Sequence, residues 1–200
     1  MEKVTTWIAA RPQLVIPGLI DSTQYECHLT LAFLGDADPA AVKAKLEDPA
    51  IGYYPHHVGW PQEPLVCEAT GTAEWVIPDS RRFQVIIVQP SIPAVGRSIY
   101  DERERIKTKL EFASDDNDHE VYKVNDAFPF IPHITMPFRA PTRDKSGLPI
   151  LDTRRMFIID KLYVCFSNPD YIEQDGQNNG VPSHINWEIG KEIPVKDVPF

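Results

Sequence analysis

The chain has 200 residues, a formal net charge of −9 and an apolar fraction of 42%. This length suffices for one domain whose hydrophobic core needs neither disulfides nor metals, and the apolar fraction is too high for a disordered chain. The acidic balance argues against binding of long nucleic acid through its phosphates, because such binding needs a Lys/Arg-rich surface, although a locally basic cleft can still hold a short nucleotide. We therefore expect a single domain over residues 1–200.

Seven segments carry the pattern of β-strands. They are rich in β-branched and aromatic residues and are bounded by Gly, Pro, Asn and Asp. In chain order they cover residues 4–10, 28–34, 65–69, 73–77, 83–89, 157–167 and 185–189. Residues 85–88 are apolar throughout, which is typical of a central strand covered on both faces.

Two helices are predicted between these strands. The first begins after Asp38, which can act as N-cap, and Pro39 takes its first helical position. Val42 and Leu46 give this helix an apolar stripe at i, i+4.

The second predicted helix covers residues 97–112 and is amphipathic. Its inner stripe consists of Ile99, Ile106 and Leu110. We interpret the charge run at residues 102–105, Glu-Arg-Glu-Arg, as solvated surface.

The three cysteines, Cys27, Cys67 and Cys165, are odd in number and have no CxxC spacing. We interpret them as reduced thiols. The sequence has neither the pattern of a signal peptide nor an apolar run as long as a membrane span. These features predict a cytoplasmic protein that does not enter a membrane, and they leave its oligomeric state open.

The loop at residues 52–64 is rich in aromatic side chains, and Tyr53 and Trp60 in it could stack on the bases of a nucleotide substrate. The favoured alternative is that these rings seal the loop onto the core. Its two adjacent histidines do not share a strand face and have no third ligand nearby. The acidic loop at residues 115–118 lacks the glycine and spacing of an EF-hand. We expect no metal and no cofactor.

One short pattern occurs twice, as His28-Leu29-Thr30-Leu31 and as His133-Ile134-Thr135-Met136. In a strand, successive side chains point to opposite faces, so each His shares a face with its Thr while the apolar residues share the other face. Pro132 and Pro137 bracket the second copy and keep its strand short. The repetition predicts two halves of one site.

Two imidazoles at one site can act as a base and an acid, since the unperturbed pKa of histidine, about 6.5, lets both forms exist near neutrality. Neighbouring Thr hydroxyls can hydrogen-bond phosphoryl oxygens. This set of groups suits phosphodiester cleavage without a metal. The alternative, that His28 and His133 are buried histidines bonded into a sheet, explains one copy better than two. We interpret His119 and His184, which lack the pattern, as surface or loop residues.

Residues 28–35, His-Leu-Thr-Leu-Ala-Phe-Leu-Gly, resemble the first signature of the two-histidine (2H) phosphoesterase superfamily, LigT-like group. Residues 132–136, Pro-His-Ile-Thr-Met, resemble the second signature, and residues 159–167 resemble the strand that follows it. The resemblance implies an α+β fold of two pseudo-duplicated lobes, in which two antiparallel sheets line a central groove and helices pack outside. It also implies that His28, Thr30, His133 and Thr135 are catalytic. The basic residue that often follows the second signature would correspond to Arg139, displaced by one position.

The resemblance implies a metal-independent phosphodiesterase that cleaves a small cyclic or 2′-5′/3′-5′-linked nucleotide. Viral members of the superfamily degrade cyclic oligonucleotide signals, so evasion of antiviral defence is one role that it suggests. Two alternatives stay open. One is processing of RNA 2′,3′-cyclic phosphate ends or 2′-5′ RNA ligation, and the other is a module that sequesters a nucleotide without cleaving it.

Overall fold

The computed structural model describes residues 4–16, 20–21, 28–51, 64–76, 82–90, 98–113, 120–127, 129–136, 154–171 and 182–194. Most of its strands form one sheet: β1 (Thr6–Ala10), β4 (Leu29–Gly35), β5 (Leu65–Val76), β6 (Arg82–Pro90), β7 (His133–Thr135), β8 (Arg155–Ile159), β9 (Leu162–Ser167) and β10 (His184–Glu188). This eight-stranded sheet is antiparallel and has the order β10-β9-β1-β4-β7-β6-β5-β8. A separate two-stranded sheet joins β2 (Val15–Ile16) to β3 (Ile20–Asp21).

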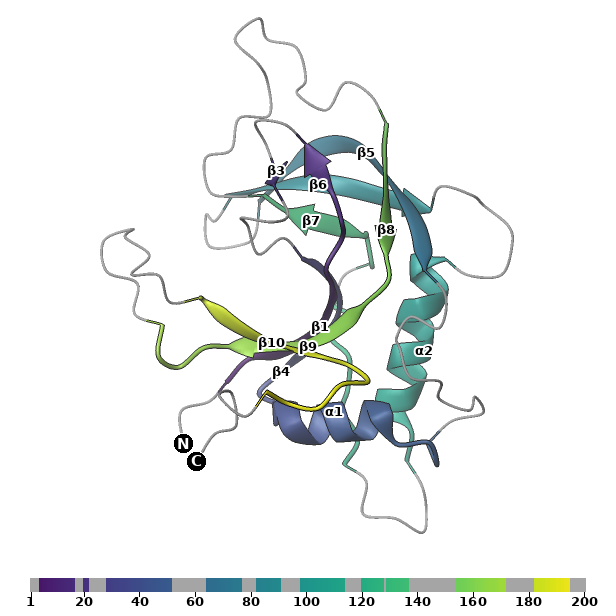
Figure 1. The fold of residues 1–200 in the computed structure, drawn as a ribbon, viewed down its shortest axis with the longest axis vertical. Helices are drawn as coiled ribbons and strands as arrows, with labels where there is room; N and C mark the ends of the chain where they lie inside the picture. The colour runs from purple at the N-terminus through teal and green to yellow at the C-terminus, as the bar shows by residue number, and fades with distance from the viewer. Residues whose placement is uncertain are drawn as a thin grey trace, which may run out of the picture.

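The large sheet is strongly curled (Figure 1), so that β5, β6 and β7 face a second group made of β1, β4, β9 and β10. The edge strand β8 runs between the two groups and continues into β9 after two residues. Just after β1, the backbone N–H of Gln13 donates a 3.2 Å hydrogen bond to the carbonyl of Ile158. This bond ties the edge strand to the opposite part of the curl.

Two helices lie on one side of the sheet (Figure 1): α1 (Pro39–Glu47) contacts β9, α2 (Ile99–Glu111) contacts β4, and the two helices contact each other. The predicted start of α1 is confirmed, because the Asp38 side chain accepts a 3.0 Å hydrogen bond from the N–H of Ala40. Ser98 begins α2 with a capping box, in which its side chain and that of Asp101 each bond the backbone N–H of the other residue.

The interpretation of residues 102–105 as solvated surface is wrong for two of them. Glu102 is 1% exposed and Arg103 is 8% exposed. At 3.6 residues per turn, both positions fall on the same helix face as Ile99 and Ile106. Burial is possible because both charges are paired: Glu102 with Arg105 at 3.1 Å, and Arg103 with Asp126.

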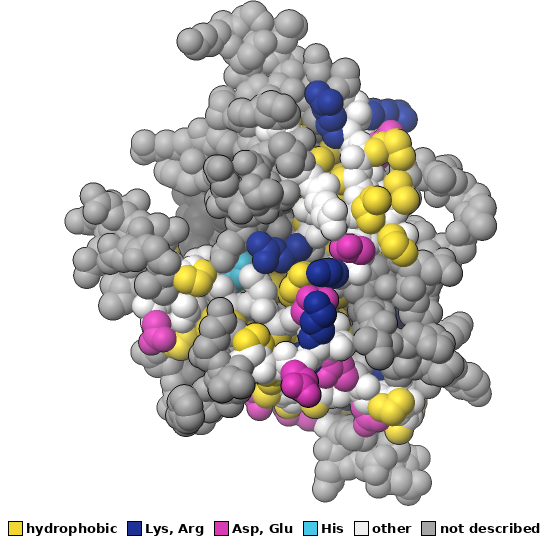
Figure 2. Space-filling model, in the orientation of Figure 1, with side chains coloured by type: hydrophobic (Ala, Val, Ile, Leu, Met, Phe, Trp, Pro, Cys, Tyr) yellow, Lys and Arg dark blue, Asp and Glu magenta, His cyan; other side chains and the backbone are white. Residues whose placement is uncertain are grey.

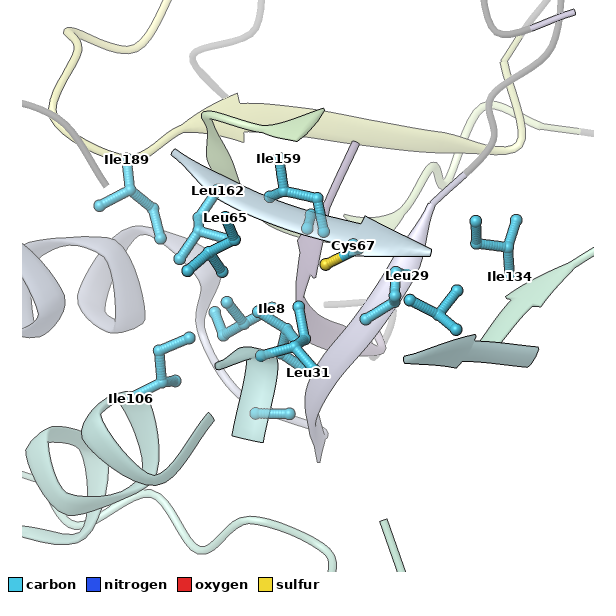
Figure 3. Close-up of a cluster of buried hydrophobic side chains, with 14 of the residues drawn as sticks. Ile8, Leu29, Leu31, Leu65, Cys67, Ile106, Ile134, Ile159, Leu162 and Ile189 are labelled. Atoms are coloured by element: carbon cyan, nitrogen blue, oxygen red, sulfur yellow. The ribbon is translucent and has the colours of Figure 1, made fainter. Parts of the chain in front are cut away.

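The core lies between the helices and one face of the curled sheet. Figure 3 shows side chains from many elements meeting there, among them Ile8 of β1, Leu29 and Leu31 of β4, Ile134 of β7 and Ile106 of α2. Each of these five is at most 2% exposed. The apolar residues of both His-x-Thr motifs therefore anchor their strands in the core, and the His and Thr residues belong to the opposite face.

Several strand boundaries differ from the prediction. Residues 65–69 and 73–76 belong to the single strand β5, which carries a register shift between Ala69 and Gly71. Residues 157–167 are split between β8 and β9 at Asp160-Lys161, where the chain passes from one edge of the sheet to the other side of the curl.

The α+β class is confirmed, whereas the expected division into two sheets is replaced by one curled sheet that contains both motif strands. The pseudo-duplication into two lobes stays a prediction.

Candidate functional site

The two motif strands are immediate neighbours in the sheet. β4 pairs with β7 in antiparallel fashion, and Leu29 stands across from Ile134. Continuing this register by one residue in each direction places Thr30 beside His133 and His28 beside Thr135. The two motifs, far apart in the sequence, thus form one compact quartet on the face that points away from the helices, which we call the site face.

Within this quartet the two histidines are diagonal neighbours. Diagonal positions on antiparallel strands lie about 7–8 Å apart between Cα atoms. A phosphate group can fit between two side chains at that spacing, with an imidazole on either side of it and a Thr hydroxyl next to each imidazole.

His133 is partly buried, and its imidazole is oriented by a backbone contact. Its Nδ1–H donates a 2.8 Å hydrogen bond to the carbonyl of Ile131, which leaves the lone pair of the neutral ring on Nε2. The indole of Trp75 covers the ring at a centroid distance of 4.3 Å. Burial lowers the pKa of His133, and the hydrogen bond to Ile131 offsets part of this effect. The neutral ring with its lone pair on Nε2 is therefore the dominant form at pH 7.

His28 lies in a cluster of aromatic rings. Its ring centroid is 5.9 Å from that of Trp7 on β1 and 5.2 Å from that of His184 on β10, and Trp7 and His184 are 5.5 Å apart. Trp7 and His184 lie in β1 and β10, and His28 directly precedes β4, so the curl of the sheet brings the three rings together. Each histidine of the quartet thus packs against a tryptophan.

The interpretation of His184 as a surface or loop residue is wrong. It is the first residue of β10 and is 8% exposed. Its Nδ1 lies 3.1 Å from the Ser183 hydroxyl. Burial, followed by the positive charge of Arg11, lowers the pKa of His184. Its strand, His-Ile-Asn-Trp-Glu, alternates polar and apolar residues as the motif strands do, and that signal could have identified His184 as a strand residue.

Three residues expected to bind substrate, Tyr53, Trp60 and Arg139, lie outside the described residues, as does His119. A cation that the sequence did not single out does lie near the quartet. Arg11 directly follows β1, and its guanidinium carbon is 5.9 Å from the ring centre of Tyr163 on β9.

Among the described residues, no cluster of side chains is suited to hold a metal ion and no thiol is suited to act as a nucleophile. No cluster of three or more His, Cys, Asp or Glu side chains that could hold a metal ion occurs in the described ranges. Cys67 and Cys165 are buried, and burial raises the pKa of Cys67 to about 12. The thiol of Cys67 therefore stays protonated and is a poor nucleophile.

The face of the molecule in Figure 2 carries charges of both signs. Figure 2 shows a histidine beside Lys and Arg side chains, with acidic and basic side chains interleaved elsewhere on this view. Among the described residues, no helix is long and apolar enough to cross a membrane.

Neither protein-family models nor curated proteins give a match to the sequence. Among solved structures, the chain is similar to E. coli LigT complexed with 3'-AMP, with TM-score 0.47, 15% identity, and coverage of 94% of this chain and 99% of that one. It is also similar to a phosphoesterase, with TM-score 0.46, 16% identity and coverage of 92% and 98%. E. coli LigT complexed with ATP gives TM-score 0.44, 15% identity and coverage of 94% and 99%.

Proposed function

We propose that the protein is a phosphodiesterase that cleaves a phosphate ester by general acid–base catalysis between His28 and His133. The observation that carries the proposal is the pairing of β4 with β7, which gathers both His-x-Thr motifs on one face of the sheet. A general acid or base typically contributes about 10²–10⁴-fold in rate, so a pair of imidazoles can supply much of the chemistry without a metal.

His133 is the candidate base. The hydrogen bond from Nδ1 to the Ile131 carbonyl and the lowered pKa both favour a neutral ring whose Nε2 can accept a proton. The proton comes from water, or from a ribose 2′-hydroxyl when the substrate carries one next to the scissile phosphate. His28, on the other side of the phosphate, then delivers a proton to the leaving oxygen. In a second hydrolytic step the roles can exchange.

Thr30 and Thr135 are the candidate phosphate ligands. Each lies across the strand pair from one of the histidines, so its hydroxyl can donate to a non-bridging oxygen of a phosphate held between the rings. Charge that develops on those oxygens in the transition state is stabilised by such preorganised donors.

The proposed substrate is a small cyclic or 2′-5′/3′-5′-linked nucleotide, a class that includes the cyclic oligonucleotide signals of antiviral defence. The acidic overall charge, −9, supports a small substrate over long nucleic acid. The role in evading antiviral signalling is part of this proposal and depends on cleavage of such a signal.

The test compares the wild type with His28→Ala and His133→Ala on cyclic di- and trinucleotides, 2′-5′ oligoadenylate and 2′,3′-cyclic mononucleotides, with products identified by mass spectrometry. We expect turnover by the wild type with EDTA present, and at least a hundredfold lower kcat in each variant. Circular dichroism checks that both variants fold.

Other outcomes point elsewhere. Full activity in either variant would remove the assignment of the site. Ligand recovered intact after stoichiometric binding would indicate a sequestering module, and action restricted to RNA ends would indicate end processing or ligation.

A further inference from the structure

Arg11 extends the site face beyond the quartet. Along β1, Ile8 and Ala10 point into the core, and the alternation of a strand directs Arg11 to the other face. The register in which Ala10 stands across from Leu29, continued by one residue, places Arg11 across from His28.

The guanidinium of Arg11 has no carboxylate partner among the described residues. Glu188, which stands across from Tyr163 on the neighbouring strand, pairs instead with Lys191 at 2.9 Å and with Lys161 at 3.8 Å. The charge of Arg11 nevertheless acts within the site, because it contributes to the lowered pKa of His184. A guanidinium with no carboxylate partner among the described residues is suited to bind an anion.

Tyr163 supplies a second group at this position. Its ring lies under the guanidinium of Arg11 at 5.9 Å, within the range of a cation–π interaction. Burial is the main cause that raises the pKa of Tyr163, so its hydroxyl stays protonated and can donate a hydrogen bond to an anion.

Arg11 and Tyr163 meet on the β9 side of β1, away from the strand pair that carries the quartet. The guanidinium leans toward β9, whereas the quartet lies on β4 and β7, with β1 between them. Adjacent strands are about 4.7–4.9 Å apart, so the separation from the centre of the quartet is on the order of 10 Å. An anion there belongs to a neighbouring unit of the substrate.

We propose that Arg11 and Tyr163 bind a second phosphate of the substrate, one nucleotide away from the phosphate that is cleaved. This inference rests on the proposed function and narrows its substrate class. The preferred substrate is a dinucleotide or larger, in which the second phosphate is either a diester within the chain or a terminal monoester. A 2′,3′-cyclic mononucleotide has no such group and is a poor substrate.

The test uses three 2′-5′-linked probes: diadenylate, diadenylate with a 5′-phosphate, and triadenylate without terminal phosphate. We expect the wild type to prefer one or both of the last two. The preference is the ratio of kcat/KM for a probe with two phosphates to kcat/KM for plain diadenylate. In Arg11→Met the preference falls about tenfold to hundredfold, as expected for loss of a charged hydrogen bond. Arg11→Lys retains part of the preference.

Lys191→Met is the matched control. It removes one positive charge near Tyr163, but a charge that is paired with Glu188, and the preference stays as in the wild type. If Arg11→Met loses only the preference for diadenylate with a 5′-phosphate, the second phosphate is a terminal monoester. If it loses the preference for triadenylate, the second phosphate is an internal diester. A wild type without any preference, or an unchanged preference in Arg11→Met, overturns the inference.

Calorimetry on the His28→Ala/His133→Ala double variant separates this inference from the proposed function, because it measures binding without turnover. We expect diadenylate with a 5′-phosphate, or triadenylate, to bind more tightly than plain diadenylate, and the difference to vanish when Arg11→Met is added. Equal binding of all three probes overturns the second-phosphate subsite. Activity that survives in the single His variants overturns the acid–base assignment and leaves this binding result standing.

Discussion

At the scale of single residues, the two imidazoles of the quartet lie in different surroundings. His133 is fixed by a backbone carbonyl and one indole, whereas His28 packs against the rings of Trp7 and His184. The backbone bond specifies the tautomer of His133. The ring cluster restricts the position of His28. His184 belongs to this cluster, so it is a candidate positioning residue.

We predict that His184→Ala lowers kcat about tenfold to hundredfold with little change in KM. Loss of the ring lets the imidazole of His28 move away from the leaving oxygen, and a small misplacement of a catalytic group has a cost of this size. His184→Phe restores most of kcat, because it keeps an aromatic ring beside His28. Steady-state kinetics on the best substrate measures both effects.

Trp187→Phe is the control for a loosened β10, because Trp187 is buried and packs on Phe166 at 4.6 Å. It lowers stability and leaves kcat near the wild-type value. If His184→Phe is as inactive as His184→Ala, the ring is not what positions His28.

The sequence predicts the quartet because its pattern occurs twice, but it does not predict the surroundings of the quartet. Trp7, Trp75 and His184 lie in strands far from the motifs along the chain, and only the curl of the sheet places their rings beside His28 and His133. No local pattern encodes such contacts.

At the scale of elements, local signals predict helices better than strand pairing. The N-cap at Asp38 and the stripe of Ile99, Ile106 and Leu110 are local and are confirmed. Whether β4 pairs with β7 or lies in another sheet depends on contacts between distant segments. For that reason the sequence does not predict that both motif strands belong to one eight-stranded sheet. The merging of two predicted strands into β5 likewise depends on pairing with β6 and β8.

The capping box of α2 gives a prediction at this scale. Ser98→Ala removes the side-chain acceptor for the N–H of Asp101, which is 3.2 Å away, and should lower the free energy of unfolding by about 1 kcal/mol. Because α2 packs on the core face of the sheet, kcat should not change. Urea unfolding followed by circular dichroism measures the first effect, and an activity assay measures the second.

Ser98→Thr keeps the hydroxyl acceptor and serves as the control, with a free energy of unfolding close to that of the wild type. A loss of kcat in Ser98→Ala that exceeds the small change in folded population would indicate that α2 couples to the site, contrary to the separation of the two faces.

At the scale of the whole molecule, one curled sheet divides the structure into a core face and a site face. The motif strands contribute to both faces: Leu29 and Ile134 pack in the core, and the His and Thr residues of the two motifs lie on the site face. Burial of His133 and His184 on the site face follows from the curl, which brings surrounding strands over them. Protonation of these two buried histidines therefore affects the stability of the whole fold.

This coupling predicts acid destabilisation in a defined pH range. Burial lowers the pKa of both His133 and His184 in the folded protein below the ordinary value, about 6.5, that applies when the chain unfolds. As the pH falls from about 7.5 through 6.5, the unfolded chain takes up protons that the folded chain does not, so the free energy of unfolding falls. The carboxyls of Asp101 and Asp126, whose pKa values are also lowered, act only at more acidic pH.

Urea unfolding at pH 7.5 and at pH 5.5 measures this loss of stability. His184→Gln removes one of the two titrating groups while keeping a polar side chain, so its loss between the two pH values should be smaller than that of the wild type, whatever its stability at pH 7.5. Ser98→Ala changes stability without removing a histidine and should show the wild-type loss. An equal loss in His184→Gln and in the wild type would mean that His184 titrates alike in the folded and unfolded chain, and that its burial against Trp7 and His28 does not disfavour its charged form.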